Sequence, residues 1–119
     1  MNMKTSTSDS LSHAGTVLCT RADLIADSGV CALLAGEQVA LFYLPEQNPP
    51  LYALGNHDPH GHANVLSRGI VGDLNGELVV ASPLYKQHFS LRTGKCIEAP
   101  ELSVPVYNVT LRDNLVICE

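Results

Sequence analysis

The chain has 119 residues, enough for one domain with its own core. Apolar residues make up 45% of it, but only four Tyr and two Phe are aromatic and Trp is absent, so the core must consist mainly of Val, Leu, Ile and Ala. The formal net charge of -5 gives no electrostatic support to nucleic-acid binding, and we expect no nucleic-acid partner.

Residues 1–15 are polar, rich in Ser and Thr and without hydrophobic periodicity, which predicts a disordered segment ahead of a β domain over residues 16–119. The chain shows neither the apolar run of a signal peptide nor the roughly 18 apolar residues of a membrane span. We therefore expect a cytoplasmic protein without a membrane partner. In that compartment cysteines without C-x-x-C spacing are expected to be buried thiols rather than disulfides. They are Cys19, Cys31, Cys96 and Cys118.

The first half of the chain reads as short strands separated by turns. A helical turn is expected over Arg21–Asp27, and a hairpin turn at Ala35-Gly36-Glu37. The strands flanking that turn are apolar on both faces, which indicates strands inside a sandwich or small barrel. The strands predicted here are Thr16–Thr20, Val30–Leu34, Gln38–Leu44 and Leu51–Leu54.

The second half begins with an irregular stretch, residues 55–64, that contains three His, two Gly and a Pro. Asn75-Gly76 is a strong hairpin signal, because both residues tolerate positive φ. Further strands are predicted over Gln87–Leu91, Ser103–Leu111 and Leu115–Cys118, and no long helix is predicted. Short strands at roughly ten-residue spacing indicate an all-β sandwich or barrel.

The chain carries two loop motifs, Leu66-Ser67-Arg68-Gly69 and Ser82-Pro83-Leu84-Tyr85 with Phe89 and Thr93-Gly94, that resemble those of Rieske iron–sulfur domains. In such domains one loop carries Cys-x-His followed by Leu-Ser-x-Gly, and the other carries Cys-Pro-Leu-His followed by Phe and Thr-Gly. Leu66-Ser67-Arg68-Gly69 matches the end of the first motif, and Ser82-Pro83-Leu84-Tyr85 with Phe89 and Thr93-Gly94 matches the second. The resemblance implies a Rieske-like stack of small antiparallel sheets with two long tip loops.

The metal ligands of both motifs are replaced. Ser82 and Tyr85 stand at the Cys and His positions of the second loop. The first loop has either Asn56-His57-Asp58 or Pro59-His60-Gly61 where Cys-x-His would fall, and neither contains cysteine. Because Rieske ligation takes two thiolates and two imidazoles, we expect this chain to bind no cluster.

A chain that keeps both loop motifs but lacks their metal ligands is similar to the small subunit of cytoplasmic NAD(P)H-dependent nitrite reductases. The similarity covers about residues 21–116. The specific part combines Asn56-x-Asp58-Pro59, residues 63–70 (Ala-Asn-Val-Leu-Ser-Arg-Gly-Ile) and residues 80–89 (Val-Ala-Ser-Pro-Leu-Tyr-Lys-Gln-His-Phe). The resemblance implies a subunit without a prosthetic group that is not itself catalytic. Its partner would be a large subunit carrying FAD, an iron–sulfur cluster and sirohaem, which reduces nitrite to ammonium in nitrate assimilation.

We expect the chain to dock on that large subunit through the former cluster tip. Four of the seven basic residues, Arg68, Lys86, Arg92 and Lys95, fall in or near the two motifs, either as a docking patch or as ordinary solvated surface. Tyr85 is expected to fill the space of the cluster, Ser82 to provide a turn hydroxyl, and His88 to face outward. The docking candidates are Asn56, Asp58, Arg68, Ser82, Tyr85, Lys86 and His88.

Two alternatives remain open. One is a Rieske-type ferredoxin that carries electrons, which would be red-brown in colour. The other is a mononuclear metal protein built on His57, His60 and His62 with Asp58, although this spacing matches no common zinc pattern. The simpler interpretation of these histidines is a solvated loop in which their side chains are exposed.

Overall fold

The computed structural model describes residues 15–119, so the segment expected to be disordered lies outside the described residues apart from Gly15. Within that range the chain forms strands and two short 3-10 helices, η1 (Arg21–Asp23) and η2 (Leu66–Arg68). The strands are β1 (Thr16–Thr20), β2 (Ser28–Leu34), β3 (Glu37–Tyr43), β4 (Leu51–Gly55), β5 (His57–Asp58), β6 (Ala63–Asn64), β7 (Ile70–Leu74), β8 (Glu77–Ala81), β9 (His88–Ser90), β10 (Val106–Tyr107), β11 (Val109–Arg112) and β12 (Leu115–Cys118).

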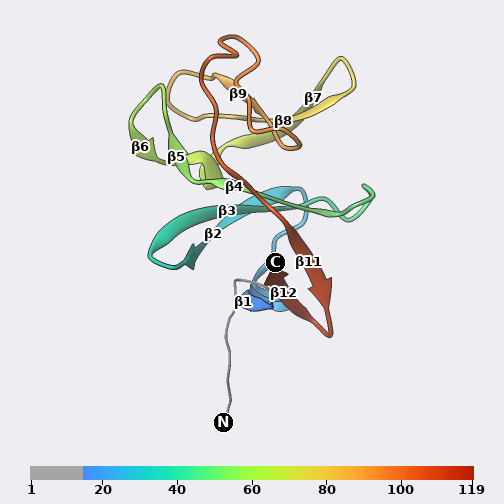
Figure 1. The fold of residues 1–119 in the computed structure, drawn as a ribbon. Helices are drawn as coiled ribbons and strands as arrows, with labels where there is room; N and C mark the ends of the chain where they lie inside the picture. The colour runs from blue at the N-terminus through green and yellow to red at the C-terminus, as the bar shows by residue number, and fades with distance from the viewer. Residues whose placement is uncertain (1–14) are drawn as a thin grey trace.

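Three antiparallel sheets stack one above another, as Figure 1 shows. The lower sheet has the order β1-β12-β11, the middle sheet β10-β4-β3-β2 and the upper sheet β7-β8-β9. A two-stranded hairpin, β5-β6, stands beside the upper sheet. The predicted all-β, Rieske-like stack of small sheets is confirmed.

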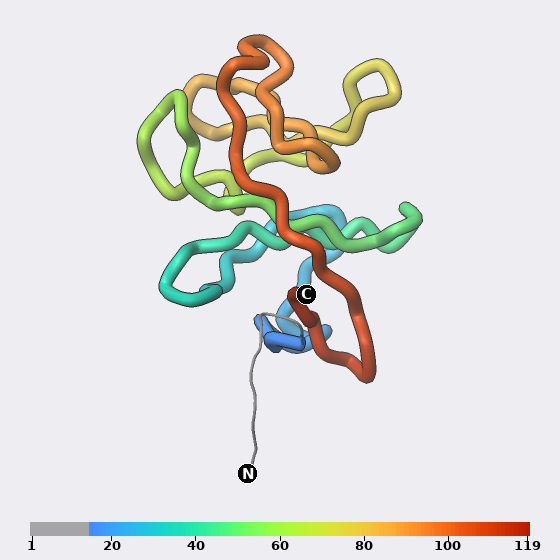
Figure 2. The backbone as a smooth tube through the Cα atoms, viewed as in Figure 1, coloured from blue at the N-terminus to red at the C-terminus, as the bar shows by residue number. Residues whose placement is uncertain are grey.

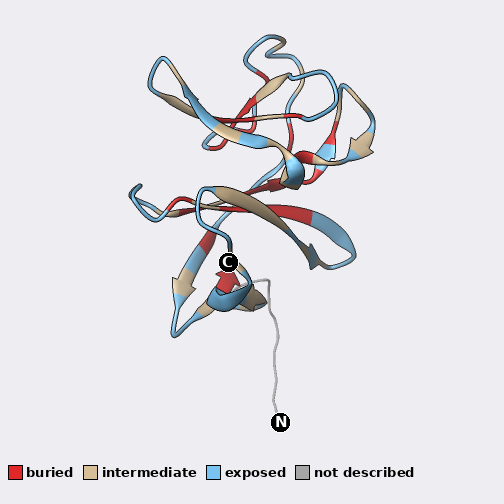
Figure 3. Ribbon diagram, turned by 180° about the vertical axis from the view of Figure 1, so that it is seen from behind, coloured by how far each residue is buried: buried red, intermediate tan, exposed pale blue. Residues whose placement is uncertain are grey.

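The middle sheet supplies both hydrophobic cores, because β3 is buried on its two faces. Ala40 and Phe42 point into the upper core, while Val39 and Leu41 point into the lower one, and all four are fully buried. The alternation follows from the strand period of two. Figure 2 shows this sheet crossing the centre of the molecule, and Figure 3 shows its buried segments in red. The expectation of a strand inside a sandwich is confirmed.

Both predicted hairpin turns form. β2 and β3 close at Leu34 opposite Glu37, and β7 and β8 close at Leu74 opposite Glu77. Asn75 and Gly76 have φ values of 52° and 90°, the conformation of the two-residue hairpin turn that their sequence predicts.

Three predicted elements differ from the structure. Ser103–Leu111 is not one strand: β10 pairs with β4, whereas β11 pairs with β12, so the segment crosses from the middle sheet to the lower sheet. Figure 2 shows this crossing in red. The strand expected over Gln87–Leu91 is limited to β9, and the helical turn is limited to η1. A residue pattern alone does not indicate that a strand changes sheets.

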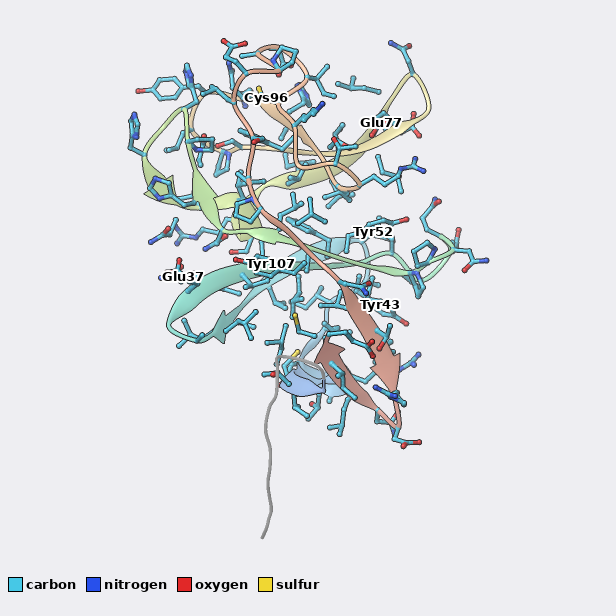
Figure 4. All side chains as sticks on the ribbon, in the orientation of Figure 1. Glu37, Tyr43, Tyr52, Glu77, Cys96 and Tyr107 are labelled. Carbon is cyan, nitrogen blue, oxygen red and sulfur yellow. The ribbon has the colours of Figure 1, made fainter. Side chains whose placement is uncertain are left out.

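The cysteines form no disulfide. Cys96 (Figure 4) and Cys118 are buried, and Cys19 is half-buried. Cys31 is exposed on β2, an edge strand, so the expectation of a buried thiol is wrong there. Burial raises the pKa of the Cys96 and Cys118 thiols, which keeps them protonated at neutral pH. Within residues 15–119 no helix has the length and apolar character to cross a membrane.

Candidate functional site

The two motif-bearing loops meet beside the upper sheet, and we call them the tip loops. The first, residues 58–62, runs from the last residue of β5 to β6; the second, residues 82–87, connects β8 to β9. The second loop is closed by backbone bonds: the Ser82 N–H donates to the Gln87 carbonyl at 2.8 Å, and the Lys86 N–H donates to the Ser82 carbonyl at 3.1 Å. Lys86 takes a φ of 59°, which turns the chain back into β9.

Asp58 links the two tip loops from inside. Its side chain is fully buried, and its Oδ2 accepts a hydrogen bond of 2.5 Å from the Ser82 hydroxyl. Its Oδ1 accepts the backbone N–H groups of His60 at 2.8 Å and Gly61 at 3.1 Å. One carboxylate therefore shapes the first loop and fastens it to the second.

These bonds hold Asp58 in its charged form. Burial alone would raise the pKa of the carboxyl, but the hydrogen bonds from Ser82, Gly61 and His60 outweigh it and leave the pKa below its ordinary value. A buried carboxylate is tolerated when donors surround it, and here three of them do.

Two further contacts join the loops. A Cβ placed on Gly61 would lie 2.4 Å from Leu84 Cδ1, so the leucine rests directly on the glycine. The rings of His60 and Tyr85 meet edge to face, with centroids 5.0 Å apart and planes at 85°. We call the three contacts Asp58–Ser82, Gly61–Leu84 and His60–Tyr85 the clasp.

Asn56 fastens the base of the first tip loop to the body of the domain. It is 2% exposed; its Nδ2 donates to Gln38 Oε1 at 2.9 Å, and its Oδ1 accepts the Ser67 N–H at 2.7 Å. Its backbone bonds both Gln38 and Leu66. Asn56 therefore ties β3 and η2 to the loop.

The docking candidates divide by burial. Asn56, Asp58 and Ser82 are buried and hold the loops from within, so they lie beneath the surface that a partner would meet. Arg68, Tyr85 and Lys86 are exposed and His88 is partly exposed, as a docking surface requires.

Tyr85 does not occupy the space of the cluster. It is 64% exposed, so the expectation that its ring fills that space is wrong. The Asp58 carboxylate and the Ser82 hydroxyl occupy the junction between the loops instead, which leaves the ring outside. Ser82 is also the predicted turn hydroxyl, since its Oγ accepts the Leu84 N–H at 3.3 Å.

The four basic residues of the two motifs do not form one patch. Lys86 precedes β9 beside Ser82, and Arg68 precedes Ile70, which pairs with Ala81 at the same end of the upper sheet. Arg92 follows Leu91, whose N–H bonds Leu78 near the opposite end of that sheet. Lys95 lies on the same side, because its carbonyl accepts the N–H of Ser90, which pairs with Val79. Only Arg68 and Lys86 therefore accompany the tip.

His88 pairs with a residue that sequence reasoning missed. Glu98 accepts the His88 backbone N–H at 2.8 Å and lies 2.6 Å from its Nδ1. Burial opposes ionisation of Glu98, but its bonds with His88 leave its pKa below the ordinary value. Nothing in the sequence indicated this contact, because His88 and Glu98 meet only in the folded chain.

The tip does not provide the donors of a Rieske cluster or another metal. No group of three His, Cys, Asp or Glu side chains within residues 15–119 is placed to hold a metal ion. The His57 and His62 rings are 6.4 Å apart, while His60 packs on Tyr85. The loops supply a carboxylate and a hydroxyl, both hydrogen-bonded to each other, and no thiolate. This donor set does not fit a cluster that needs two cysteines.

Comparison with known proteins shows which family the chain belongs to. Residues 16–119 match the family of the Rieske-like [2Fe-2S] domain. The nitrite reductase (NADH) small subunit of Salmonella typhimurium is 44% identical over 99 residues, which cover 83% of this chain and 91% of that protein. The NMR structure of the Escherichia coli protein NirD has a TM-score of 0.76 at 40% identity and covers 87% of this chain and 94% of that one.

Two other similarities bear on organisation and fold. A nitrite reductase [NAD(P)H] large subunit of Klebsiella oxytoca is 43% identical over 89 residues, which are 75% of this chain but only 9% of that protein. A carbazole 1,9a-dioxygenase ferredoxin from Nocardioides aromaticivorans has a TM-score of 0.72 at 20% identity, covering 88% of this chain and 96% of the ferredoxin, which shows the fold alone. The fold, the retained loop motifs and these identities together place the chain in the family of nitrite reductase (NADH) small subunits, built on the Rieske-like domain.

Proposed function

We propose that this chain is the non-catalytic small subunit of an NAD(P)H-dependent nitrite reductase and that it binds a large subunit which reduces nitrite to ammonium. Family membership over 83% of the chain supports the assignment. The large subunit would carry the FAD, the iron–sulfur cluster and the sirohaem, and would supply all the redox chemistry. The complex would be cytoplasmic, which agrees with four cysteines that form no disulfide.

The Klebsiella oxytoca protein supports a physical association with the catalytic machinery. There, a segment similar to this chain is part of a chain named as the large subunit. Domains that are fused in one protein and separate in another are expected to touch in both. We infer that this chain occupies an equivalent place by non-covalent docking.

The observation that carries the docking proposal is the composition of the closed tip. Tyr85 and Leu84 are 64% and 42% exposed, and Lys86 lies next to them. Tyrosine is enriched among the central residues of protein interfaces and among hot spots, and a lysine beside it is suited to the polar rim. Lys86 and Arg68 on a chain of net charge -5 would favour an acidic partner surface opposite the tip.

We do not propose the ferredoxin or the mononuclear metal alternative. The ferredoxin likeness extends to the fold alone, and the tip loops contain no cysteine that would hold a cluster. The tip histidines are turned to other partners, with His57 bonded to Asn64 at 3.2 Å and His60 packed on Tyr85.

The test is a binding measurement with the cognate large subunit, purified as holoenzyme. The unmodified chain is expected to bind, and Tyr85→Ala and Lys86→Glu are each expected to weaken binding by about tenfold or more, as for interface hot spots. Arg112→Glu is the matched control, because Arg112 is an exposed cation on the lower sheet. Absence of a complex at micromolar concentration contradicts the function; equal weakening by the control contradicts docking through the tip.

A further inference from the structure

We propose that Asp58 is the positioning residue of the docking tip: its buried carboxylate, bonded to Ser82, sets the spacing of the two tip loops that a metal cluster sets in Rieske domains. The inference rests on the proposed function, since it concerns the surface through which the chain would bind the large subunit. Asp58 acts through Ser82 and touches no partner itself, because it is fully buried.

The architecture leaves the relative position of the loops to side chains. The first loop belongs to the β5-β6 hairpin and the second to the β7-β8-β9 sheet, and no strand pairing joins these two sheets in the described part of the chain. In a Rieske domain, ligands from both loops grip one cluster, which crosslinks them. Here the crosslink at the same junction is the 2.5 Å bond between Asp58 and Ser82.

The structure also indicates which of the two sequence registers places a side chain at this junction. Of the two triplets considered for the first motif, Asn56-His57-Asp58 has its last residue bonded to Ser82, at the former Cys position. In Pro59-His60-Gly61, the last residue has no side chain and only leaves room for Leu84. A hydrogen-bonded pair of protein groups thus stands where two metal ligands are expected.

The clasp transmits this spacing to the exposed residues. Ser82 lies two residues before Leu84 and three before Tyr85, and its carbonyl accepts the Lys86 N–H. A shift of Ser82 is therefore expected to move the exposed residues Leu84, Tyr85 and Lys86 with it. On the other side, the same carboxylate fixes the backbone of His60 and Gly61. Tyr85 rests on the His60 ring and Leu84 on Gly61.

One consequence is that the docking surface keeps its shape without iron. A loop pair spaced by a cluster changes when the cluster is lost, whereas a loop pair spaced by a carboxylate and a hydroxyl does not. We expect a chain produced in iron-depleted medium to bind the large subunit as tightly as one produced with iron, and weaker binding would overturn the inference.

The main experiment measures binding and local order in the same variants. Asp58→Ala and Ser82→Ala are each expected to weaken binding about tenfold, because the competent loop arrangement becomes a minor population. The double variant is expected to lose less than the sum of the two single losses, because both changes break the bond between Asp58 and Ser82. Amide exchange at Lys86, whose N–H bonds Ser82 and not Asp58, is expected to become faster in Asp58→Ala.

Two controls separate positioning from contact and from general stability. Tyr85→Ala removes a ring placed at the interface and its contact with His60 but leaves the Asp58–Ser82 bond, so it is expected to weaken binding while Lys86 exchange rises less than in Asp58→Ala. Val116→Ala removes methyl groups from the lower core, far from the tip, and is expected to lower stability without changing the affinity.

Each outcome decides the inference. Wild-type affinity in Asp58→Ala, or equal weakening in Val116→Ala, overturns it. If the unmodified chain binds no large subunit, the proposed function fails. The amide-exchange measurement still decides whether Asp58 spaces the loops. Unchanged exchange at Lys86 in Asp58→Ala overturns that claim.

Discussion

The middle sheet and the tip loops of this domain are held by opposite means. β3 is fixed by apolar packing on both faces, with Val39, Ala40, Leu41 and Phe42 fully buried between two cores. The tip loops are fixed by a few directional contacts around one carboxylate, with exposed side chains directly outside. In the cores the stabilising free energy is shared among many apolar contacts. At the tip a large part of it depends on the hydrogen bonds of one group, the Asp58 carboxylate.

This difference teaches where the domain is stable and where it is adjustable. Loss of one methylene group in a two-sided core affects the whole fold, because both outer sheets pack on the same strand. Loss of one bond at the tip affects the position of two loops and leaves the stack of sheets in place. Regions of low local stability are the ones in which binding surfaces are usually found.

The largest expected effect comes from removing the central side chain of the upper core. Phe42→Ala is expected to lower the free energy of unfolding by about 3–5 kcal/mol, because a fully buried ring leaves a cavity. Urea unfolding followed by circular dichroism measures it. Leu33→Ala, on the exposed side of β2 at 66% exposure, is the control and is expected to change little. Comparable losses in both variants would contradict the dominance of the central strand.

A smaller effect is expected at the junction between the first motif and the upper sheet. A Cβ on Gly69 would lie 2.4 Å from the Ala81 carbonyl oxygen and 2.7 Å from Val80 Cγ2, so Gly69→Ala is expected to cost about 1–3 kcal/mol by overpacking. Gly72→Ala, three residues further on, meets nothing within 4 Å and is expected to be neutral or slightly stabilising. Thermal unfolding of both variants measures the contrast, and equal midpoints would refute the close approach.

The apolar middle sheet was predictable from the sequence. Alternation of apolar residues over 38–44 predicted a strand buried on both faces, and Asn75-Gly76 predicted the β7–β8 turn. These signals are local, since residue period and turn chemistry depend on near neighbours. The Rieske-like motifs then predicted the stack of sheets and the two loops.

The polar contacts at the tip were not predictable to the same degree. Asp58 and Ser82 are 24 residues apart in the chain, and nothing in either motif indicates that they bond. Tyr85 was expected inside and lies outside, because the same pair occupies the junction. The partner of His88, Glu98, lies ten residues away across a turn. Long-range polar pairs depend on the tertiary fold, which a residue pattern does not encode locally.

The smallest effect on the whole fold is expected from acid, which protonates Asp58 at the tip and leaves the apolar packing of the middle sheet unchanged. The folded pKa of Asp58 lies below its ordinary value, so its charged form stabilises the fold above the ordinary pKa of about 4, and that stabilisation is lost as the pH falls through the lower folded value. Protonation of Oδ1 or Oδ2 weakens acceptance from the surrounding donors.

The tip is therefore expected to loosen with acid before the middle sheet does. Amide protection at His60 and Gly61 is expected to fall below about pH 4, while protection at Leu41 persists, since it depends on apolar packing. Asp58→Asn supplies the control: its amide oxygen still accepts the loop N–H groups, but it does not titrate, so its tip protection is expected to be weaker at neutral pH and free of the acid step. Simultaneous loss at Leu41 and Gly61, or an acid step that persists in Asp58→Asn, would mean that the two regions open as one unit and that the carboxylate is not what separates them.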